Sequence, residues 1–258
     1  MVSEKIQFPG SAGDLLTARL DFPEGEPAAW VLFAHCFTCS KDLKAVVNLS
    51  RALNGAGLAV MRFDFTGLGE SEGDFADTSF ASNVDDLVAA ARYLETEHAA
   101  PKILVGHSLG GAAVLQAAAE VPAAVAVATI GAPADPAHVT HLLTGAIDDI
   151  RRDGEAEVML AGRRFRIGEK FLDDLEETKQ NERIGSLDRA LIIFHSPVDM
   201  IVGIENAARI YAIARHPKSF ISLDQADHLL TDSSDASYVG EVLAAWARKY
   251  IPECRTRG

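Results

Sequence analysis

The chain has 258 residues, of which 48% are hydrophobic, and its formal net charge is −13. This length allows one large domain or at most two small ones, and the acidity argues against nucleic acid or an anionic membrane as a partner. Residues 1–16 lack the apolar stretch of a signal peptide, and no apolar run approaches the length of a membrane span. Three cysteines cannot form a paired disulfide framework. We therefore expect a soluble, cytoplasmic protein.

Short apolar runs alternate with segments of helical period along the chain. Most of these runs are continuous, as is typical of strands that are buried on both faces of a sheet. Residues 4–8 are expected to add an antiparallel edge strand. The other strands are expected at 17–22, 28–35, 58–65, 102–107, 124–131, 190–196 and 219–224.

The segments between these runs predict helices. The segment at 82–98 is expected to begin with Ser82 or Asn83 as its N-cap and to carry Asp85 and Asp86 in its first turn. The alternation of strand and helix predicts an α/β fold in which a mostly parallel sheet carries helices on both faces. Helices are expected at 42–57, 82–98, 109–122, 204–217 and 236–251.

Residues 134–188 interrupt the alternation. They contain a helical pattern at 137–154, a possible hairpin at 158–168 and a second helical pattern at 169–181. An insertion of this length is too large for an ordinary loop. We interpret it as a cap over a site in a single domain that spans residues 1–258. The alternative is an excursion far from any chemistry.

The stretch KILVGHSLGGAAVLQ carries the strongest chemical signal. Residues 106–110 match G-x-S-x-G where an apolar strand meets a helix. A sharp strand-to-helix turn brings neighbouring backbone so close that only glycine fits at Gly106 and Gly110. It also lifts Ser108 out of the carboxyl edge of the sheet, where ligands bind in open α/β folds. This context predicts that Ser108 is a nucleophile; the alternative is a glycine-rich structural turn.

A serine nucleophile needs a base, and the base needs an orienting acid. His228 follows the last predicted strand on a loop, where the base is expected, whereas His195 lies within an apolar strand and is expected to be structural. Asp199 follows the preceding strand and is the expected acid. Asp224 and Asp227 are rivals, but they lie too near His228 in sequence to approach it from the neighbouring strand.

These residues carry a resemblance to the α/β-hydrolase superfamily. DFTGLGESEG (64–73) resembles the D-x-x-G-x-G-x-S turn that is common there. AHCFTCSKD and HPKSFISLDQADHLL resemble a narrower bacterial group, often fused to an OsmC-like peroxide-handling domain. The resemblance implies a serine carboxylesterase-type α/β-hydrolase fold with an eight-stranded sheet, helices on both faces and a cap insertion. It also suggests kinship with cinnamoyl and feruloyl esterases.

The same resemblance implies an oxyanion hole. In α/β-hydrolases the loop after the third strand supplies a backbone N–H, usually from an H-G-x sequence. His35-Cys36-Phe37 occupies that place, so the N–H groups of Phe37 and Leu109 are the candidate donors. Cys36 stands where many relatives have glycine, and we expect it to pack its thiol under the loop as a small hydrophobe.

Cys36 and Cys39 form a C-x-x-C between a strand and a helix, which is also a thioredoxin-like arrangement. A zinc site would need further ligands, and no paired histidine spacing is evident. A second hypothesis is therefore a hydrolase-like binding protein, or a redox partner that uses this pair and has weak or vestigial esterase activity. The complete set of serine, base and acid argues against it.

The favoured prediction is a serine hydrolase that cleaves short to medium acyl or aryl esters through an acyl-enzyme. Its partner would be a small-molecule ester, with no nucleic acid or membrane, and the chain would be a monomer or homodimer. No metal or organic cofactor is expected. Thioesters and amides remain open. The residues expected to contact substrate are His107, Leu142, Phe165 and Phe171.

Overall fold

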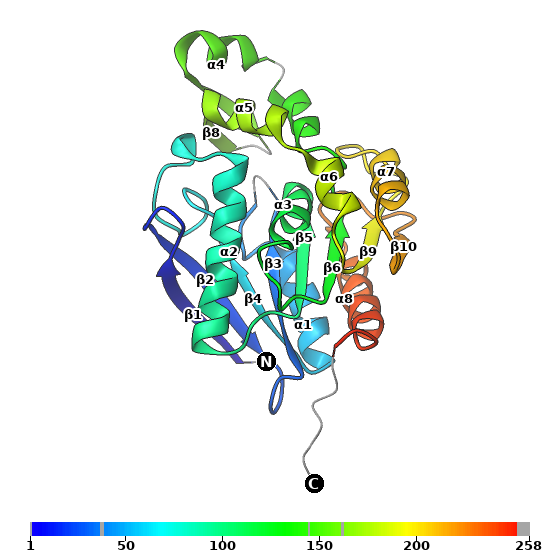
Figure 1. Ribbon diagram of the computed structural model, residues 1–258. Helices are drawn as coiled ribbons and strands as arrows, with labels where there is room; N and C mark the ends of the chain where they lie inside the picture. Colours follow the sequence, from blue (N-terminus) through cyan, green and yellow to red (C-terminus); the bar gives the residue numbers. More distant parts are fainter. Residues whose placement is uncertain (1, 37–38, 144, 161–162, 252–258) are drawn as a thin grey trace.

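The structure is a computed structural model that describes residues 2–36, 39–143, 145–160 and 163–251 (Figure 1). Its strands are β1 (Val2–Pro9), β2 (Leu15–Phe22), β3 (Ala29–Ala34), β4 (Leu58–Phe63), β5 (Ile103–His107), β6 (Ala126–Ile130), β7 (Glu155–Leu160), β8 (Arg163–Gly168), β9 (Ala190–His195) and β10 (Lys218–Ser222). Its helices are α1 (Lys44–Gly55), α2 (Phe80–Glu97), α3 (Leu109–Ala117), α4 (Ile147–Asp153), α5 (Glu169–Glu177), α6 (Gln180–Gly185), α7 (Glu205–Ile213) and α8 (Ser233–Ala247), with the short 3-10 helices η1 (Phe75–Asp77) and η2 (Pro136–Leu143).

An eight-stranded sheet forms the centre of the molecule in the order β1-β2-β4-β3-β5-β6-β9-β10. The strands β4, β3, β5, β6, β9 and β10 pair in parallel, whereas β1 and β2 are antiparallel. Every residue of β3, β4, β5, β6 and β9 is buried, which explains why the sequence shows continuous apolar runs there. The predicted fold class and the antiparallel edge at β1 are confirmed.

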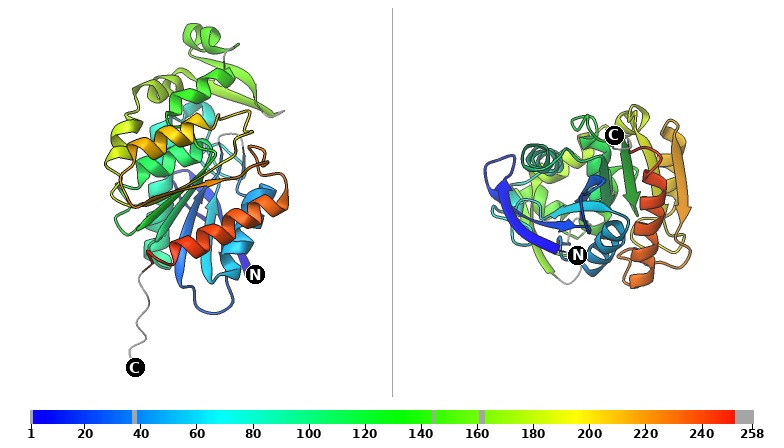
Figure 2. Two further views of the ribbon diagram at one scale, coloured as in Figure 1. Left: turned by 90° about the vertical axis from the view of Figure 1, so that its right-hand side faces the viewer. Right: turned by 90° about the horizontal axis from the view of Figure 1, so that it is seen from below.

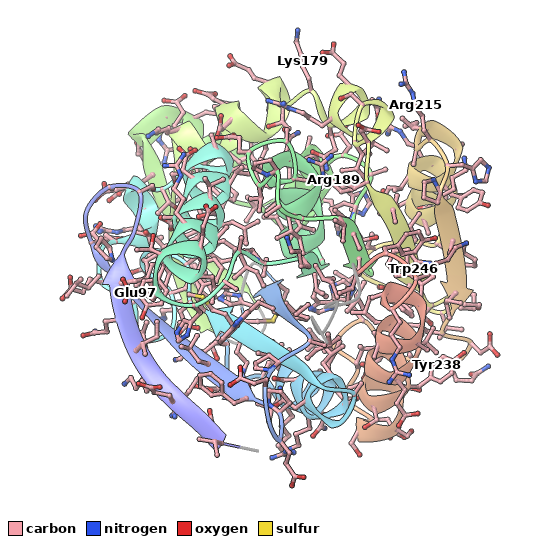
Figure 3. All side chains as sticks on the ribbon, turned by 60° about the horizontal axis from the view of Figure 1, so that its bottom comes forward. Glu97, Lys179, Arg189, Arg215, Tyr238 and Trp246 are labelled. Carbon is pink, nitrogen blue, oxygen red and sulfur yellow. A yellow bond between two sulfur atoms is a disulfide. The ribbon has the colours of Figure 1, made fainter. Side chains whose placement is uncertain are left out.

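Helices cover both faces of the sheet (Figure 2). Apolar side chains of α1 and α8 form one cluster against one face, and those of α2, α3 and α7 pack in a second cluster against the other. On α8, Trp246 Nε1 donates a hydrogen bond to Ser219 Oγ of β10 at 3.2 Å, while Tyr238 is exposed (Figure 3). The last helix is thereby attached to the edge strand that precedes His228.

The insertion between β6 and β9 contains η2, α4, the hairpin β7–β8, α5 and α6. The expected single helix at 137–154 is instead a 3-10 helix followed by the short helix α4. Buried residues of the insertion, including Ile167, Phe171 and Leu175, belong to the same apolar cluster as α2 and α3. In Figure 1 the insertion lies above the sheet, beyond these two helices. It therefore packs on the main body and has no separate core.

The expected N-cap of α2 is wrong by three or four residues. Ser79 is the N-cap: its side chain accepts a hydrogen bond from Ser82 N, and Ser82 Oγ accepts one from Ser79 N. The helix begins at Phe80, so Asp85 and Asp86 lie beyond its first turn. Asp86 instead accepts hydrogen bonds from Thr66 and Ser11. Ser82 and Asn83 are common N-cap residues, whereas Phe80 and Ala81 are not, so the sequence suggested that the helix begins later than it does.

No helix in the described part of the chain combines the length and the apolarity that a membrane crossing requires.

Replacing Ser79 by alanine should lower the free energy of unfolding by about 1 kcal/mol, because the capping hydrogen bond that Ser79 Oγ accepts from Ser82 N is lost. Urea denaturation monitored by circular dichroism measures the change. Thr96→Ala removes a hydroxyl from the exposed last turn of the same helix and should leave stability unchanged or slightly raised. Equal losses in the two variants would contradict the assigned N-cap.

Candidate active site

A strained turn presents Ser108 at the junction of β5 and α3. Ser108 has φ 55° and ψ −125°, a conformation that costs a non-glycine residue about 1–3 kcal/mol. A Cβ at Gly106 would lie 2.1 Å from the carbonyl oxygen of Gly110, and a Cβ at Gly110 would lie 2.4 Å from that of Ala34. The backbone approaches itself as closely as the motif predicts, and no larger residue fits either position.

His228 and Asp199 complete a hydrogen-bonded series with Ser108. Ser108 Oγ lies 3.0 Å from His228 Nε2, and His228 Nδ1 donates to Asp199 Oδ2 at 2.7 Å. The other oxygen, Asp199 Oδ1, accepts from the backbone N–H groups of Ile201 and Val202 at 2.8 and 2.9 Å. Three residues that are far apart in sequence thus meet in the predicted order at one edge of the sheet.

Asp199 is ionised in this arrangement. Burial alone would raise its pKa, but the hydrogen bond and charge of His228, together with the two backbone N–H groups, outweigh burial and leave the pKa below its ordinary value. A negative carboxylate fixes the proton of His228 on Nδ1. The unprotonated Nε2 is then free to accept the proton of Ser108.

Gly131 makes room for this pair, and the sequence analysis did not identify it. It follows β6 with φ 54°, and a Cβ there would lie 3.3 Å from Asp199 Oδ2 and 3.4 Å from His228 Nδ1. A side chain would crowd both groups. The signal in the sequence was a glycine directly after a buried strand, which lies between the strand before Ser108 and the strand before Asp199.

Two buried histidines bind backbone carbonyl groups next to the hydrogen-bonded set of Ser108, His228 and Asp199. His107 Nε2 donates to the carbonyl oxygen of His228, and His195 Nε2 donates to that of Val202, each at 2.7 Å. Burial, followed by the charge of His228, lowers the pKa of His107 to about 3, so its ring is neutral. The structural role expected for His195 agrees with this geometry. His107, expected to contact substrate, lies 3% exposed behind His228.

The other expected substrate contacts lie in the insertion. Leu142 is 37% exposed on η2, whereas Phe165 is 7% exposed and Phe171 fully buried. The rings of Phe165 and Phe171 pack against Phe75 of the main body at centroid distances of 6.4 and 5.6 Å. They join the insertion to the body here, and their contact with substrate stays a prediction that requires the insertion to move.

A narrow apolar cavity lies beside the nucleophile turn. Leu109, Gly110 and His35 line it, together with Phe65 and Phe75, and it has room for about one water molecule. Leu109 is the first residue of α3, so its N–H is among those that a helix leaves without an intrahelical partner. Phe37, the other expected oxyanion donor, lies outside the described residues.

A buried charge network holds the far end of the loop after β3, and sequence reasoning missed it. Lys41 is only 1% exposed; its Nζ donates to Asp64 Oδ2 at 2.7 Å and Glu70 Oε2 at 2.6 Å, and its N–H donates to Asp64 Oδ1 at 2.7 Å. Although burial alone would lower the pKa of Lys41, its hydrogen bonds to both carboxylates raise it. Hydrogen bonds from Lys41 and Lys5 lower the pKa of Glu70 to about 2.

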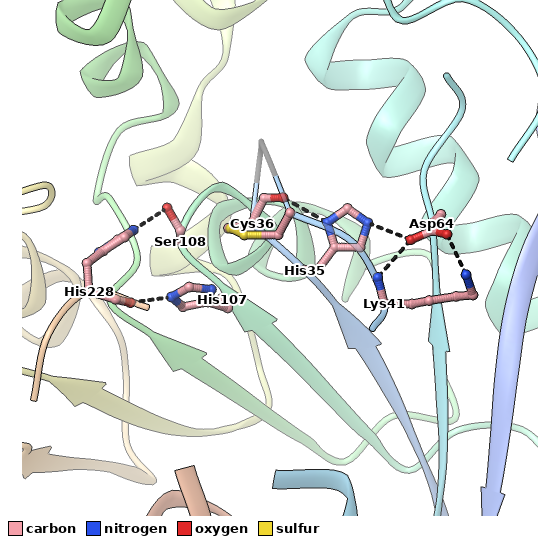
Figure 4. The surroundings of a disulfide bond; sticks show 8 residues. His35, Cys36, Lys41, Asp64, His107, Ser108 and His228 are labelled. Atoms are coloured by element: carbon pink, nitrogen blue, oxygen red, sulfur yellow. Dashed lines mark hydrogen bonds and ion pairs between the residues drawn. A yellow bond between two sulfur atoms is a disulfide. The ribbon is translucent and has the colours of Figure 1, made fainter. Parts of the chain in front are cut away.

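The start of the same loop carries a disulfide that the sequence analysis did not predict. Cys36 and Cys39 are joined, so Cys36 is buried as a bonded sulfur and not as the free thiol that was expected (Figure 4). Cys36 is among the described residues, and its φ is not positive. By distance, Cys36, Cys39 and His107 could hold a metal ion, with donor atoms within 4.8 Å of one another. In the disulfide state neither sulfur is a free thiolate.

Comparison with known proteins agrees with this geometry. The sequence model of the alpha/beta hydrolase family matches residues 31–252. The chain belongs to the alpha/beta hydrolase family. The crystal structure of the esterase domain of a Rhodothermus marinus protein is similar over 97% of this chain and 100% of that one, with 54% identity and a TM-score of 0.81.

More distant relatives agree on the fold. Est1E from Butyrivibrio proteoclasticus, solved with ferulic acid bound, shares 20% identity over 95% of this chain and 99% of its own, with a TM-score of 0.78. The rat mitochondrial palmitoyl-protein thioesterase ABHD10 is 33% identical over 39% of this chain. The matches cover 33% to 53% of the length of the curated relatives. The chain is thus an alpha/beta hydrolase with esterase homologues.

Lys41→Met should lower the free energy of unfolding by about 3 kcal/mol or more, because Asp64 would lose its cationic partner while remaining buried. Thermal and urea denaturation measure the loss. Lys44→Met, at the exposed start of α1, is the matched control and should change stability by less than about 0.5 kcal/mol. A Lys41 variant as stable as this control would show that the network is not a structural constraint.

Proposed function

We propose that this chain is a serine carboxylesterase that hydrolyses short to medium acyl or aryl esters through an acyl-enzyme. The observation that carries the proposal is the continuous series of hydrogen bonds from Ser108 through His228 to Asp199, at 3.0 and 2.7 Å. A hydroxyl is a weak nucleophile at neutral pH and needs this kind of base and orienting acid. The esterase domain at 54% identity supports the same reaction class.

In the acylation step, Ser108 Oγ attacks the ester carbonyl while His228 Nε2 accepts the hydroxyl proton. Asp199 stabilises the imidazolium that forms, and it is already ionised because its pKa is lowered. His228 then protonates the leaving alcohol, and the acyl group remains on Ser108. A water molecule then attacks the acyl carbonyl and gives a proton to the same nitrogen. The bond between the acyl group and Ser108 Oγ breaks, His228 returns the proton to Oγ, and the acid is released.

The negative charge of the tetrahedral intermediate requires donors that are in place before the reaction. We assign this role to the N–H groups of Leu109, which follows the nucleophile directly, and of Phe37. Loss of one such donor raises the barrier by about 3 kcal/mol. These steps use side chains and backbone only, and we propose that the reaction needs no metal or organic cofactor.

We propose that residues 1–258 form one domain in which the insertion at 134–188 is a cap. Its support is the packing of Phe165 and Phe171 on Phe75, which also lines the cavity beside Leu109. We propose that the acyl or aryl group enters on this side of Leu109, where the cavity holds about one water molecule and has to widen as the cap moves. Its lining is mostly aromatic and aliphatic, which favours apolar groups.

Ser108→Ala should reduce hydrolysis of p-nitrophenyl butyrate to the level of the buffer, because no nucleophile remains, while the melting temperature stays unchanged or rises as strain is relieved. A fluorophosphonate probe should label the parent protein on Ser108 and leave the variant unlabelled. Hydrolysis retained by the variant would refute the proposed function. An unlabelled parent protein would favour a hydrolase-like binding protein.

Asp199→Asn should lower kcat by roughly 10⁴, because an amide N–H facing Nδ1 would place the imidazole proton on Nε2, where it cannot accept from serine. Asp224→Asn is the control: Asp224 is exposed, accepts from Ser222 Oγ at 2.8 Å and was the rival acid in the sequence. It should keep full activity in steady-state assays of the same ester. A larger loss at Asp224 than at Asp199 would overturn the assignment.

A further inference from the structure

The Cys36–Cys39 disulfide lies at the candidate active site and joins no distant parts of the fold. The two cysteines are three positions apart, with their Cα atoms separated by 5.2 Å, in the loop between β3 and α1 (Figure 4). Stabilisation by a disulfide grows with the length of the chain segment that it closes. This one encloses two residues, so its effect is confined to the loop.

The loop is fixed at its other end without the disulfide. Lys41 is bound to Asp64 through both its N–H and its Nζ, and its carbonyl oxygen accepts from Arg62 Nη1 at 2.5 Å. Cys39 N donates to Cys36 O at 3.1 Å within the turn itself. The bond is therefore not needed to attach the loop to the body, and what it restricts is the position of Cys36 relative to Cys39.

The cysteine pair lies close to the groups that position the proposed base. The donor atoms of Cys36, Cys39 and His107 lie within 4.8 Å of one another, and His107 Nε2 donates to the carbonyl oxygen of His228. His107 also directly precedes Ser108. A change at the sulfur atoms therefore takes place beside the residue that connects the proposed nucleophile with the proposed base.

Reduction changes the room that the two sulfur atoms need. A disulfide holds two sulfur atoms about 2 Å apart, whereas unbonded heavy atoms in contact need roughly 3.5–4 Å. Cys36 and His107 are buried, at 4% and 3% exposed, whereas Cys39 is partly exposed. The added separation has to be taken up by a rotation of Cys39 or by a displacement of His107.

We propose that Cys36 and Cys39 form a thiol–disulfide exchange site that controls the hydrolase, which is active as the disulfide and slow as the dithiol. The ligand class is a dithiol reductant. One of its thiolates attacks the more accessible Cys39 sulfur, the Cys36–Cys39 bond breaks, and Cys36 leaves as a thiolate. The second thiol of the reductant then attacks the reductant sulfur that is bonded to Cys39, and Cys39 is released.

Two electrons pass from the reductant to the cysteine pair in this exchange, the reductant becomes a disulfide, and the new thiolates take up protons according to their own pKa values. Activity falls where the dithiol displaces His107, because His107 then no longer holds the carbonyl oxygen of His228, the proposed base, in place. The inference rests on the proposed function, since it is the hydrolysis of an ester that the exchange would control.

The test is a redox titration of the purified protein in buffers of oxidised and reduced dithiothreitol containing a chelator, followed by anaerobic removal of the reagents. Free thiols and p-nitrophenyl butyrate kinetics are measured on the same samples. Thiols should rise from one to three per chain, because the chain has three cysteines. We expect kcat to fall at least tenfold along the same curve, with KM changed less than threefold, and to recover on reoxidation.

Two variants sharpen the result. Cys39→Ser should have the low kcat of the dithiol at every redox poise, and Cys254→Ser should behave like the parent protein. A parent kcat that stays within twofold while the thiol count rises would overturn the inference, and this needs no variant to fold. Failure of the proposed function appears separately, as hydrolysis by Ser108→Ala at every poise.

Discussion

The geometry of the site depends first on the close contact of backbone at the turn that carries Ser108. The positive φ of this serine is held because β5 and α3 meet with no side chain between them: any Cβ at Gly110 would collide with the carbonyl oxygens of Ala34 and His35. The contact does two things at once. It holds the hydroxyl at the edge of the sheet, and it presses the start of α3 against the end of β3, where the loop with the proposed oxyanion donor begins.

Parallel strand order explains how the base and the acid reach this serine. Ser108 follows β5, Asp199 follows β9 and His228 follows β10, and β6 lies between β5 and β9. A side chain at the end of β6 would crowd the contact between Asp199 and His228. Gly131 occupies that end, and its positive φ turns the chain away just where Asp199 and His228 meet. The arrangement thus depends on a residue that takes no part in the chemistry.

Much of this could be predicted because it follows from local patterns. Buried parallel strands read as continuous apolar runs, and G-x-S-x-G at such a strand indicates a turn that only glycine permits. The residues that follow β9 and β10 could be assigned because those strands end at a common edge. The start of α2 could not be predicted, because its capping box uses two serines and three closely spaced polar residues offered the same signal.

Contacts between distant segments were the harder part. From the local sequence, Lys41 would be assigned to the surface. In the structure its ammonium is buried and donates to Asp64 and Glu70, which are distant in sequence. The cysteine pair was recognised as a motif, but its state could not be read from its spacing. Phe165 and Phe171 were assigned to substrate by their position in the insertion, whereas the structure buries both against Phe75.

The charged groups around the loop respond to pH, whereas the disulfide responds to a reductant. Glu70 has a lowered pKa, so its ion pairs are present above its ordinary value of 4.5 and fade only as the pH falls towards about 2. Lys41 has a raised pKa, so its contribution is complete below 10.5 and is lost only at more alkaline pH. His107 stays neutral above about pH 3, and burial likewise lowers the pKa of His35. Glu70, Lys41 and His107 therefore keep their charge states between about pH 5 and 9. The bond between Cys36 and Cys39 is different, since a reductant can break it at constant pH, and it lies at the other end of the same loop.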